Sequence, residues 1–331
     1  MFLIEDVDAE CLADELRLEL IEACESNNCS QSLLDQVAGS VSSAWKKDVR
    51  LKLIPYGLDE QEQTAILSAL AADVDEGDDV MTDVTHGFRS LPMLAMMAAF
   101  YLEAVRGTSI QGIYYGMLEL SRETGITPVV QLDGLLKFGR WIGALQQFEK
   151  DGDYSVFSPL FKESGVPHSK ALADAAFFER ITDARHASQK ISTVQPAFAK
   201  IKELPIATLF SDTLSKRMNW FRKPTFSEKE AELAHAYFKR RDYLRALIFT
   251  QEALISREVE REGDGLDNHD RREEAREYLN QEQKFRALGH LRNQMAHGTR
   301  GNNTKLKKIM KDEDILKKEI SHLMTHLLKS I

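Results

Sequence analysis

Cysteine is scarce in this sequence, and the few cysteines lie near its start. Among 331 residues there are three, Cys11, Cys24 and Cys29. Three cysteines cannot all pair with one another, and none of them forms a Cys-x-x-Cys motif. A disulfide-stapled secreted fold is therefore excluded, and we expect a protein of the reducing cytoplasm.

Long apolar runs and a secretory leader are also missing. The longest uncharged apolar run, LPMLAMMAAFYL at residues 91–102, is about a dozen residues long, whereas a membrane span needs roughly 20. The run predicts a buried helix and no membrane partner. The chain opens without the basic, apolar and small-residue segments of a signal peptide, which also favours a cytoplasmic location.

A surplus of positive charge is missing as well. The net charge is −9 and the pI is about 5.6, so the whole protein is not a general binder of polyanions. The charge is unevenly distributed, however. Residues 73–79 read DVDEGDD, whereas lysine and arginine outnumber acids after residue 284. Any nucleic-acid contact is therefore expected in the C-terminal part.

What the sequence does contain is a change of pattern near Gly134. Before it, short β-type runs at 50–57, 78–85, 109–116 and 127–132 alternate with helical patterns at 60–74 and 90–107. The opening MFLI could be one more strand before a helix at 8–25. Strands separated by helices predict a mainly parallel sheet.

After Gly134 the pattern is helical, with helices expected at 168–190, 228–260, 271–297 and 304–330, a break near 240–242, and loops at 158–167 and 261–273. The predicted fold class is α/β plus all-α. An α/β domain is expected over residues 1–136, and a helical linker and helical domain over 137–331.

The first candidate site is the segment DVTHGFRSLP, which begins at Asp83 and reads as a strand end, a turn and a helix start. Ligands of open parallel sheets bind outside the carboxyl ends of the strands, and a helix start offers free amides to phosphate. Gly87 permits a close backbone approach, while Thr85, His86 and Arg89 supply a hydroxyl, an imidazole and a cation that suit a nucleotide. A second interpretation is open: Asp83 and Thr85 only organise the turn, and Arg89 is solvated.

This segment, with the following apolar helix, IQGIYYG and TPVVQLDGLL, resembles the CRISPR-associated Rossmann-fold (CARF) domain over residues 50–150. It is most similar to the branch with an Asp-x-Thr-His-Gly-Phe-Arg signature in type III CRISPR ancillary proteins. The resemblance implies a Rossmann-like sheet and a homodimer that binds a cyclic oligoadenylate across its two-fold axis. By resemblance the ligand residues are Thr85, His86, Gly87 and Arg89, with Asp83 organising the turn and Tyr115 and Gly116 as weaker candidates.

The sequence departs from this family at its N-terminus. The family opens with a strand that ends in a small-residue ligand loop, and residues 1–30 show no such strand and loop. Either the sequence starts downstream of the family's start, or the sheet lacks its first strand.

The second candidate site is Arg292-Asn293-x3-His297, followed by Gly298. Residues four apart on a helix share a face, so Asn293 and His297 lie together and Arg292 flanks them. Gly298 is expected to end the helix. The alternative is a purely structural role, because a histidine before a C-terminal glycine also complements the helix dipole.

This motif resembles that of HEPN ribonucleases, which carry Arg-x4–6-His near the end of a core helix. The upstream segment YFKRRDYLRALIFTQEALI (237–255) is similar to the first core helices of CRISPR-associated HEPN domains, although it equally suits a tetratricopeptide-type hairpin. The resemblance implies metal-independent cleavage of single-stranded RNA without a cofactor. His297 would act as general acid or base, and Arg292 would stabilise the phosphorane. Asn293 would orient the histidine or a phosphate.

Together the two motifs predict a homodimeric sensor–effector in which a cyclic oligoadenylate activates a single-stranded endoribonuclease. One alternative is a sensor whose HEPN half only dimerises or binds RNA. Another, a transcriptional regulator, is disfavoured because no helix-turn-helix with a basic recognition helix is recognisable. No metal site is expected: His322 and His326 form a helical pair that lacks a third ligand, and we interpret them as surface residues.

Overall fold

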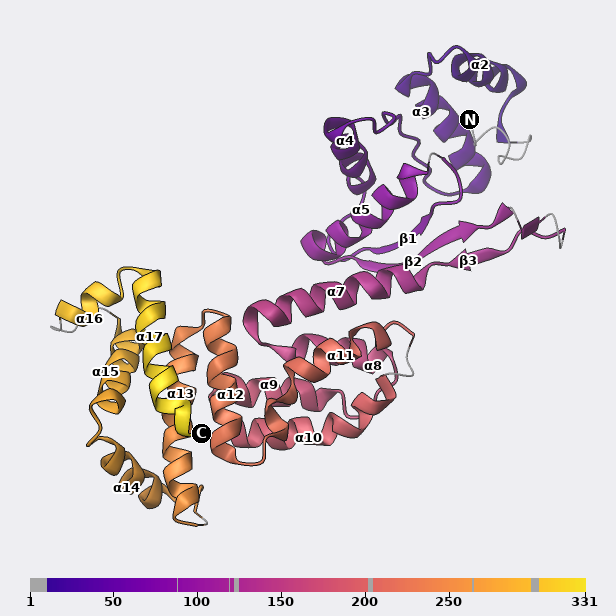
Figure 1. The fold of residues 1–331 in the computed structure, drawn as a ribbon. Coiled ribbons are helices and arrows are strands. Elements are labelled where there is room, and N and C mark those ends of the chain that lie inside the picture. Colours follow the sequence, from indigo (N-terminus) through magenta and orange to yellow (C-terminus); the bar gives the residue numbers. More distant parts are fainter. Residues whose placement is uncertain are drawn as a thin grey trace. The chain divides into compact units, whose positions relative to one another are not determined.

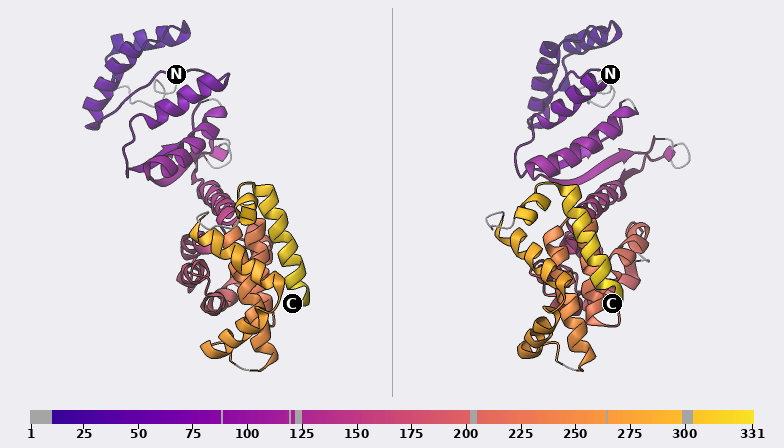
Figure 2. Two further views of the ribbon diagram at one scale, coloured as in Figure 1. Left: turned by 90° about the vertical axis from the view of Figure 1, so that its left-hand side faces the viewer. Right: turned by 60° about the vertical axis from the view of Figure 1, so that its left-hand side comes forward.

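The chain divides into two compact units, Met1–Leu136 and Lys137–Ile331 (Figures 1 and 2). The computed structural model describes residues 11–87, 89–118, 120–121, 125–201, 205–263, 265–298 and 304–331, with only the backbone for 197–201, 305 and 330. The strand expected at MFLI lies outside the described residues. Among the described residues, no helix is both long enough and apolar enough to cross a bilayer.

The N-terminal unit begins with two helices, α2 (Asp14–Glu25) and α3 (Gln31–Trp45). Ser30 caps α3 because its hydroxyl accepts from the Leu33 amide at 3.2 Å. The two helices share a small apolar cluster formed by Leu12, Leu20, Leu33, Val37 and Val41. The three cysteines are half-buried around this cluster as free thiols.

The rest of this unit is a three-stranded sheet with helices. Its elements are α4 (Glu60–Ala71), β1 (Asp79–Asp83), α5 (Ser90–Arg106), β2 (Ser109–Gly116) and β3 (Val129–Gln131). The strand order is β1-β2-β3, and α5 connects the parallel pair β1 and β2. The unit's second apolar cluster joins α5 to the sheet through Val84, Ala95, Ala99, Ile110 and Ile113.

The sheet is mixed: β1 and β2 pair in the parallel direction as expected, and β3 departs from that expectation. β3 pairs with β2 in the antiparallel direction. The Met117 amide donates to the Pro128 carbonyl at 2.9 Å, directly beyond the paired strands. The chain therefore doubles back after β2 as a hairpin, which needs no crossover helix.

The strand expected at 50–57 does not form. The side chain of Gln31 on α3 occupies its backbone instead: Gln31 Nε2 donates to the Leu51 carbonyl at 2.8 Å, and Gln31 Oε1 accepts from the Leu53 amide at 2.9 Å. One side chain thus satisfies groups that a neighbouring strand would bind, and residues 51–58 form neither strand nor helix.

The C-terminal unit is helical. Its elements are α7 (Asp133–Asp151), which begins just before the unit boundary, η2 (Tyr154–Phe157), α8 (Ser158–Glu163), α9 (Lys170–Arg180), α10 (Ala184–Ile201), α11 (Thr208–Arg217), η3 (Asn219–Arg222), α12 (Phe226–Lys239), α13 (Tyr243–Arg261), α14 (His269–Leu279), α15 (Gln283–His297), α16 (Thr304–Ile309), α17 (Glu313–Leu327) and η4 (Leu328–Ser330). One large apolar cluster runs through them, from Trp141 on α7 to Leu327 on α17.

The helix breaks follow local chemistry. The expected break near 240–242 is confirmed: Arg241 has φ of 63°, and the Asp242 carboxylate accepts from the Arg245 amide at 3.1 Å to cap α13. The loop expected at 158–167 was wrong in its first half. That part forms α8, because Pro159 suits the first turn of a helix.

Candidate functional site

The turn after β1 is organised by Asp83, as its position in the motif predicted. Asp83 lies at the carboxyl end of β1, and its Oδ1 accepts a hydrogen bond from the Thr85 amide at 2.8 Å. The Val84 amide between them donates to the Tyr114 carbonyl at 2.9 Å, so the turn is tied to β2 as well. Asp83 is thereby engaged in shaping the turn.

Thr85 connects the turn to the end of β2. Its Oγ1 accepts from the Gly116 amide at 2.8 Å, so the ends of two parallel strands meet at this side chain. Gly116 is buried, and a Cβ atom there would lie 3.0 Å from Thr85 Cγ2. The structure therefore brings Thr85 and Gly116 together. Tyr115 is half-buried and packs against the cluster beneath α5, so its predicted ligand role stays a prediction.

Gly87 is required by the backbone between the turn and α5. Its φ is +105°, and a Cβ atom would lie 2.6 Å from Leu91 Cδ1. His86 and Arg89 on either side of it are exposed. Phe88 of the motif lies outside the described residues.

The N-terminus of α5 differs from the pattern expected of a capped helix. Ser90 is the first helical residue, and Arg89 stands at the N-cap without a side-chain hydrogen bond to the helix. The first-turn amides of α5 thus have no side-chain cap at this end, next to the guanidinium of Arg89. Free amides and a cation at a helix start suit a phosphate oxygen.

The second motif lies on the last turns of α15. Asn293 and His297 are both exposed, and their spacing of four places them on one face. His297 is the last helical residue, and Gly298 follows with φ of 72°, which confirms the glycine as the end of the helix. The Gln294 side chain donates to the Gly298 carbonyl at 2.6 Å and holds this end.

Arg292 is oriented differently from its two neighbours in the motif. It is half-buried, next to the buried Leu291 and the partly buried Met295. Its Nε atom is buried and has no hydrogen-bond partner among the described residues. The aliphatic part of Arg292 is thus held by packing on α15, whereas Asn293 and His297 are exposed.

One polar residue on this face was missed by the motif analysis. His290 is exposed and lies seven residues before His297, which is nearly two full helical turns. His290, Asn293 and His297 therefore form one exposed strip on α15. The sequence does indicate this strip, because residues three and seven apart on a helix share a face. The Arg-x4-His spacing alone does not include His290.

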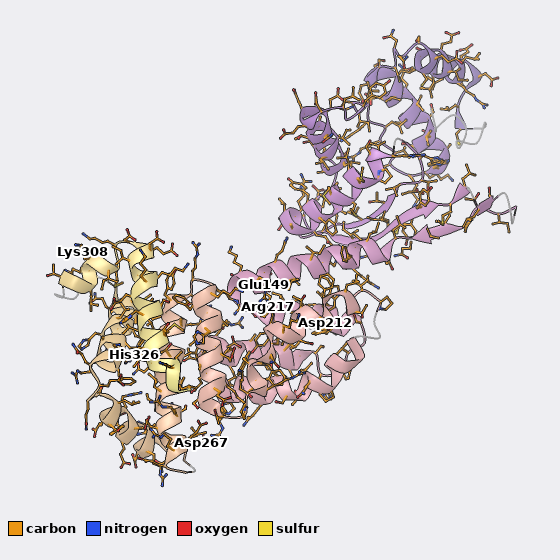
Figure 3. The ribbon with its side chains drawn as sticks, viewed as in Figure 1. Glu149, Asp212, Arg217, Asp267, Lys308 and His326 are labelled. Carbon is orange, nitrogen blue, oxygen red and sulfur yellow. The ribbon has the colours of Figure 1, made fainter. Side chains whose placement is uncertain are left out.

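The other candidate histidines have ordinary surroundings. His326 on α17 lies near Glu282, with 3.7 Å between His326 Nε2 and Glu282 Oε1 (Figure 3). Within the described part of the chain, no group of three or more His, Cys, Asp or Glu side chains is arranged to hold a metal ion.

Comparison with known proteins adds one relative. No protein-family model matches the sequence. Over 157 residues, the chain is 26% identical to a protein of Methanocaldococcus jannaschii described as CRISPR-associated protein MJ1674. The match covers 46% of this chain and 25% of that protein, so the whole relative is much longer than the similar region.

Proposed function

We propose that the protein is a CRISPR-associated, cyclic-oligoadenylate-activated endoribonuclease that cleaves single-stranded RNA without a metal ion in type III antiviral defence. The similarity to a CRISPR-associated protein supports the biological setting. The observation that carries the activity is the placement of Arg292 beside the exposed Asn293 and His297 on the last turns of α15.

The chemistry needs the groups of two such motifs, one from each subunit of the dimer, and the 2′-hydroxyl of the substrate. The ribose 2′-oxygen attacks the adjacent phosphorus, the bond to the 5′-oxygen breaks, and the products are a 2′,3′-cyclic phosphate and a 5′-hydroxyl. One proton leaves the 2′-hydroxyl and one reaches the 5′-oxygen, and His297 at the helix end is accessible for either transfer. Arg292 stabilises the charge on the phosphorane oxygens. Asn293 orients the histidine or the phosphate.

The turn after β1 supports a sensor role for the N-terminal unit. Thr85 joins the ends of β1 and β2, and the uncapped start of α5 and the exposed Arg89 lie directly after it. A hydroxyl, free amides and a guanidinium at one sheet edge suit the phosphates and riboses of an oligoadenylate. The resemblance to CARF domains assigns the ligand residues in this proposal.

A homodimer is supported by the outer face of α5. Met93, Met97, Tyr101 and Val105 recur every four residues, and each is between 47% and 63% exposed. An apolar helical stripe of this kind is typical of a surface that another copy covers. It begins within the first turns of α5, close in sequence to the candidate ligand turn.

A cleavage assay on a fluorescent single-stranded RNA, with and without each cyclic oligoadenylate, tests the proposal. His297→Ala and Arg292→Ala should abolish cleavage while ligand binding persists, and EDTA should have no effect. The matched control is His326→Ala, which should cleave normally. His326 is an exposed histidine on α17, and its ring lies near Glu282. Undiminished cleavage by the His297 variant would refute the catalytic assignment.

The sensor is tested in the same assay. Arg89→Ala should weaken binding of the activating oligoadenylate about tenfold or more, because arginine–phosphate contacts are commonly worth about 1.5–3 kcal/mol. Activated cleavage should fall and basal cleavage should not. Arg50→Ala is the control, because it removes an exposed arginine of the same unit that is ion-paired to Asp48 and Asp73. It should leave oligoadenylate binding and activated cleavage unchanged.

The alternative, a sensor whose helical unit dimerises or binds RNA without cleaving it, makes a different prediction. It expects RNA binding that depends on Arg292 but no cleavage with any cyclic oligoadenylate. A single chain supplies one Arg292–His297 motif, so cleavage requires the second motif that a dimer brings. Cleavage by the wild-type dimer therefore separates the two proposals.

A further inference from the structure

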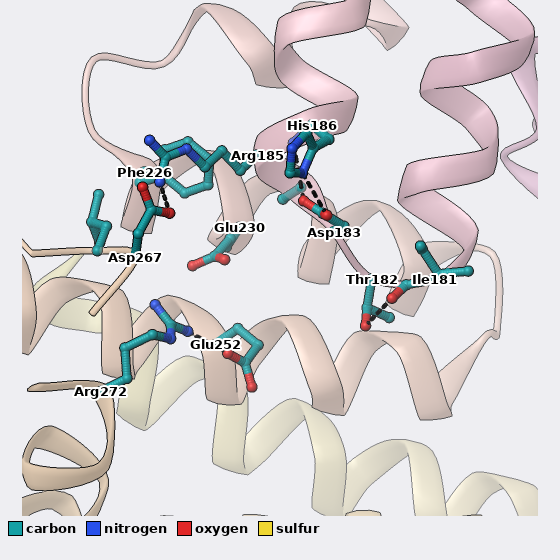
Figure 4. Close-up of a pocket in the computed structure, with 12 residues that line it drawn as sticks. Ile181, Thr182, Asp183, Arg185, His186, Phe226, Glu230, Glu252, Asp267 and Arg272 are labelled. Carbon is teal, nitrogen blue, oxygen red and sulfur yellow. Dashed lines mark hydrogen bonds and ion pairs between the residues drawn. The ribbon is translucent and has the colours of Figure 1, made fainter. Parts of the chain in front are cut away.

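The helical unit contains a pocket of about 320 Å³ that lies apart from both motifs. It is enclosed by the turn between α9 and α10, the first turns of α12, the middle of α13, and the segment that leads into α14 (Figure 4). Four carboxyl groups line it, on Asp183, Glu230, Glu252 and Asp267. Their partners differ, and the difference suggests what the pocket binds.

Three of the four carboxylates already pair with a basic group in the pocket. Glu252 Oε2 accepts from Arg272 Nη2 at 2.5 Å, and Asp183 Oδ2 lies 2.7 Å from His186 Nδ1. Asp267 forms an ion pair with Arg185. Each of these three carboxylates therefore already has a hydrogen-bond or ion-pair partner in the pocket.

Glu230 is the exception. Only 6% of it is exposed, and its Oε2 atom has no hydrogen-bond partner among the described residues. Its carboxyl group points from α12 into the pocket (Figure 4). The Ser256 hydroxyl hydrogen-bonds to the carboxyl group and accepts from Arg272 Nη1 at 3.4 Å, and these groups leave Glu230 Oε2 without a donor.

We propose that this pocket binds a small organic amine in its ammonium form, with the ammonium group donating to Glu230 Oε2. Arg185, Arg272 and His186 already have acidic partners, so none of them is left to bind an anion, whereas the unpartnered oxygen of Glu230 favours a cation. A single unpartnered carboxyl oxygen suits an ammonium group, whereas a bound metal ion needs several converging oxygens. Phe226 and Leu266 provide apolar surface for the ligand's carbon chain.

The protonation state of Glu230 gives the proposal a specific signature. Burial raises the pKa of Glu230 to about 8, with Glu252 and Glu260 raising it further and Ser256 and Arg272 opposing the rise. The other charged groups of the lining, Asp183, His186, Arg185 and Asp267, are paired as described above. The free protein therefore holds a proton on Glu230 at pH 7, and an arriving ammonium group, which favours the carboxylate, displaces that proton.

Calorimetric titration of the full chain at pH 7 tests this. The probes are n-butylamine and 1,4-diaminobutane, with n-butanol as the uncharged control, in phosphate and in MOPS, which differ in heat of ionisation and contain no primary amine. We expect saturable binding of the amines, at least about tenfold weaker binding of the alcohol, and release of nearly one proton per bound amine. Equal binding of butanol and butylamine, or no saturable binding of either amine, would overturn the proposal.

Two variants and one matched control locate the binding. Glu230→Gln keeps the side-chain volume and removes the charge, and should weaken amine binding at least about tenfold and abolish proton release. Glu252→Gln keeps Glu230 in the sequence but frees Arg272 from its ion pair with Glu252. Arg272 can then pair with Glu230, so amine binding should also weaken. The control, Glu232→Gln, alters a glutamate of the same helix that is ion-paired to Lys223 at the surface, at 2.8 Å.

The control should bind amines as the wild type does. Wild-type affinity in Glu230→Gln, with its thermal unfolding unchanged, would refute the assignment. Saturable binding of Mg²⁺ that Glu230→Gln abolishes would also refute it, because the pocket would then be a metal site. None of these measurements depends on ribonuclease activity or on cyclic oligoadenylate.

Discussion

Replacing Thr85 by valine removes one hydrogen bond at the candidate ligand turn and keeps the shape of the side chain. Thr85 Oγ1 accepts from the Gly116 amide at 2.8 Å. Valine puts a methyl group in the place of that oxygen, so the buried Gly116 amide loses its acceptor. A buried donor left without a partner costs about 1–3 kcal/mol. The packing of the other methyl group is retained, so the hydrogen bond dominates the difference.

Amide hydrogen exchange at Gly116 measures this loss directly. Since each 1.4 kcal/mol is a factor of ten, exchange of the Gly116 amide should be roughly 5- to 150-fold faster in Thr85→Val than in the wild type. Thr85→Ser is the matched control: it keeps the hydroxyl and should retain most of the protection. The measurement needs no ligand, so it tests the turn independently of the sensor proposal. Equal exchange in Thr85→Val and the wild type, or equal acceleration in both variants, would show that this bond does not hold the turn to β2.

Three further predictions test the glycine of the turn, the buried glutamate and the strip on α15. Gly87→Ala should destabilise the N-terminal unit by about 1–3 kcal/mol in denaturant unfolding. The loss should exceed that of Gly77→Ala, because Gly77 also has a positive φ but no atom within 4 Å of a new Cβ. Equal losses of stability in the two variants would contradict the close contact with Leu91. The pKa of Glu230 in the folded state is about 8, above its usual 4.5. The protonated carboxyl group therefore contributes stability that is fully present below pH 4.5 and is lost as the pH rises through 8. This contribution is at most about 5 kcal/mol. Glu230→Gln should therefore flatten the pH dependence of unfolding in that window, and an unchanged slope would place the titration elsewhere. His290→Ala should lower RNA cleavage several-fold, less than His297→Ala does, without affecting oligoadenylate binding; unaltered cleavage would exclude His290 from the substrate contact.

The elements that the sequence predicted well are those in which the local pattern decides the structure. The run SIQGIYYG forms β2 over the expected residues, and the apolar run after Ser90 forms α5. The Asp83–Thr85 contact spans two residues, so it too follows from the local sequence. Contacts of this range depend on little beyond backbone geometry and nearby side chains.

The errors occur where a distant partner decides. Residues 50–57 have the apolar content of a strand, but strand formation needs a neighbouring backbone, and the side chain of Gln31 takes its place. The antiparallel direction of β3 was not predicted for a similar reason, because strand patterns carry no information about parallel or antiparallel pairing. Both outcomes depend on residues about 20 positions or more away, or on the return path of the chain.

The pocket around Glu230 was not predicted from the sequence, although the position of Glu230 on its helix gives an indication of it. In the run SEKEAELAHAY, the acidic residues Glu228, Glu230 and Glu232 look alike. Glu230 alone of the three is buried, because it lies on the same helical stripe as the buried Ser227, Leu233 and Ala234. A carboxyl group at an apolar position must find a partner or stay protonated. Such a mismatch between residue type and helical position therefore indicates a candidate ligand site, whereas the partners that complete it, Ser256 and Arg272, become visible only once α13 and α14 are packed against α12.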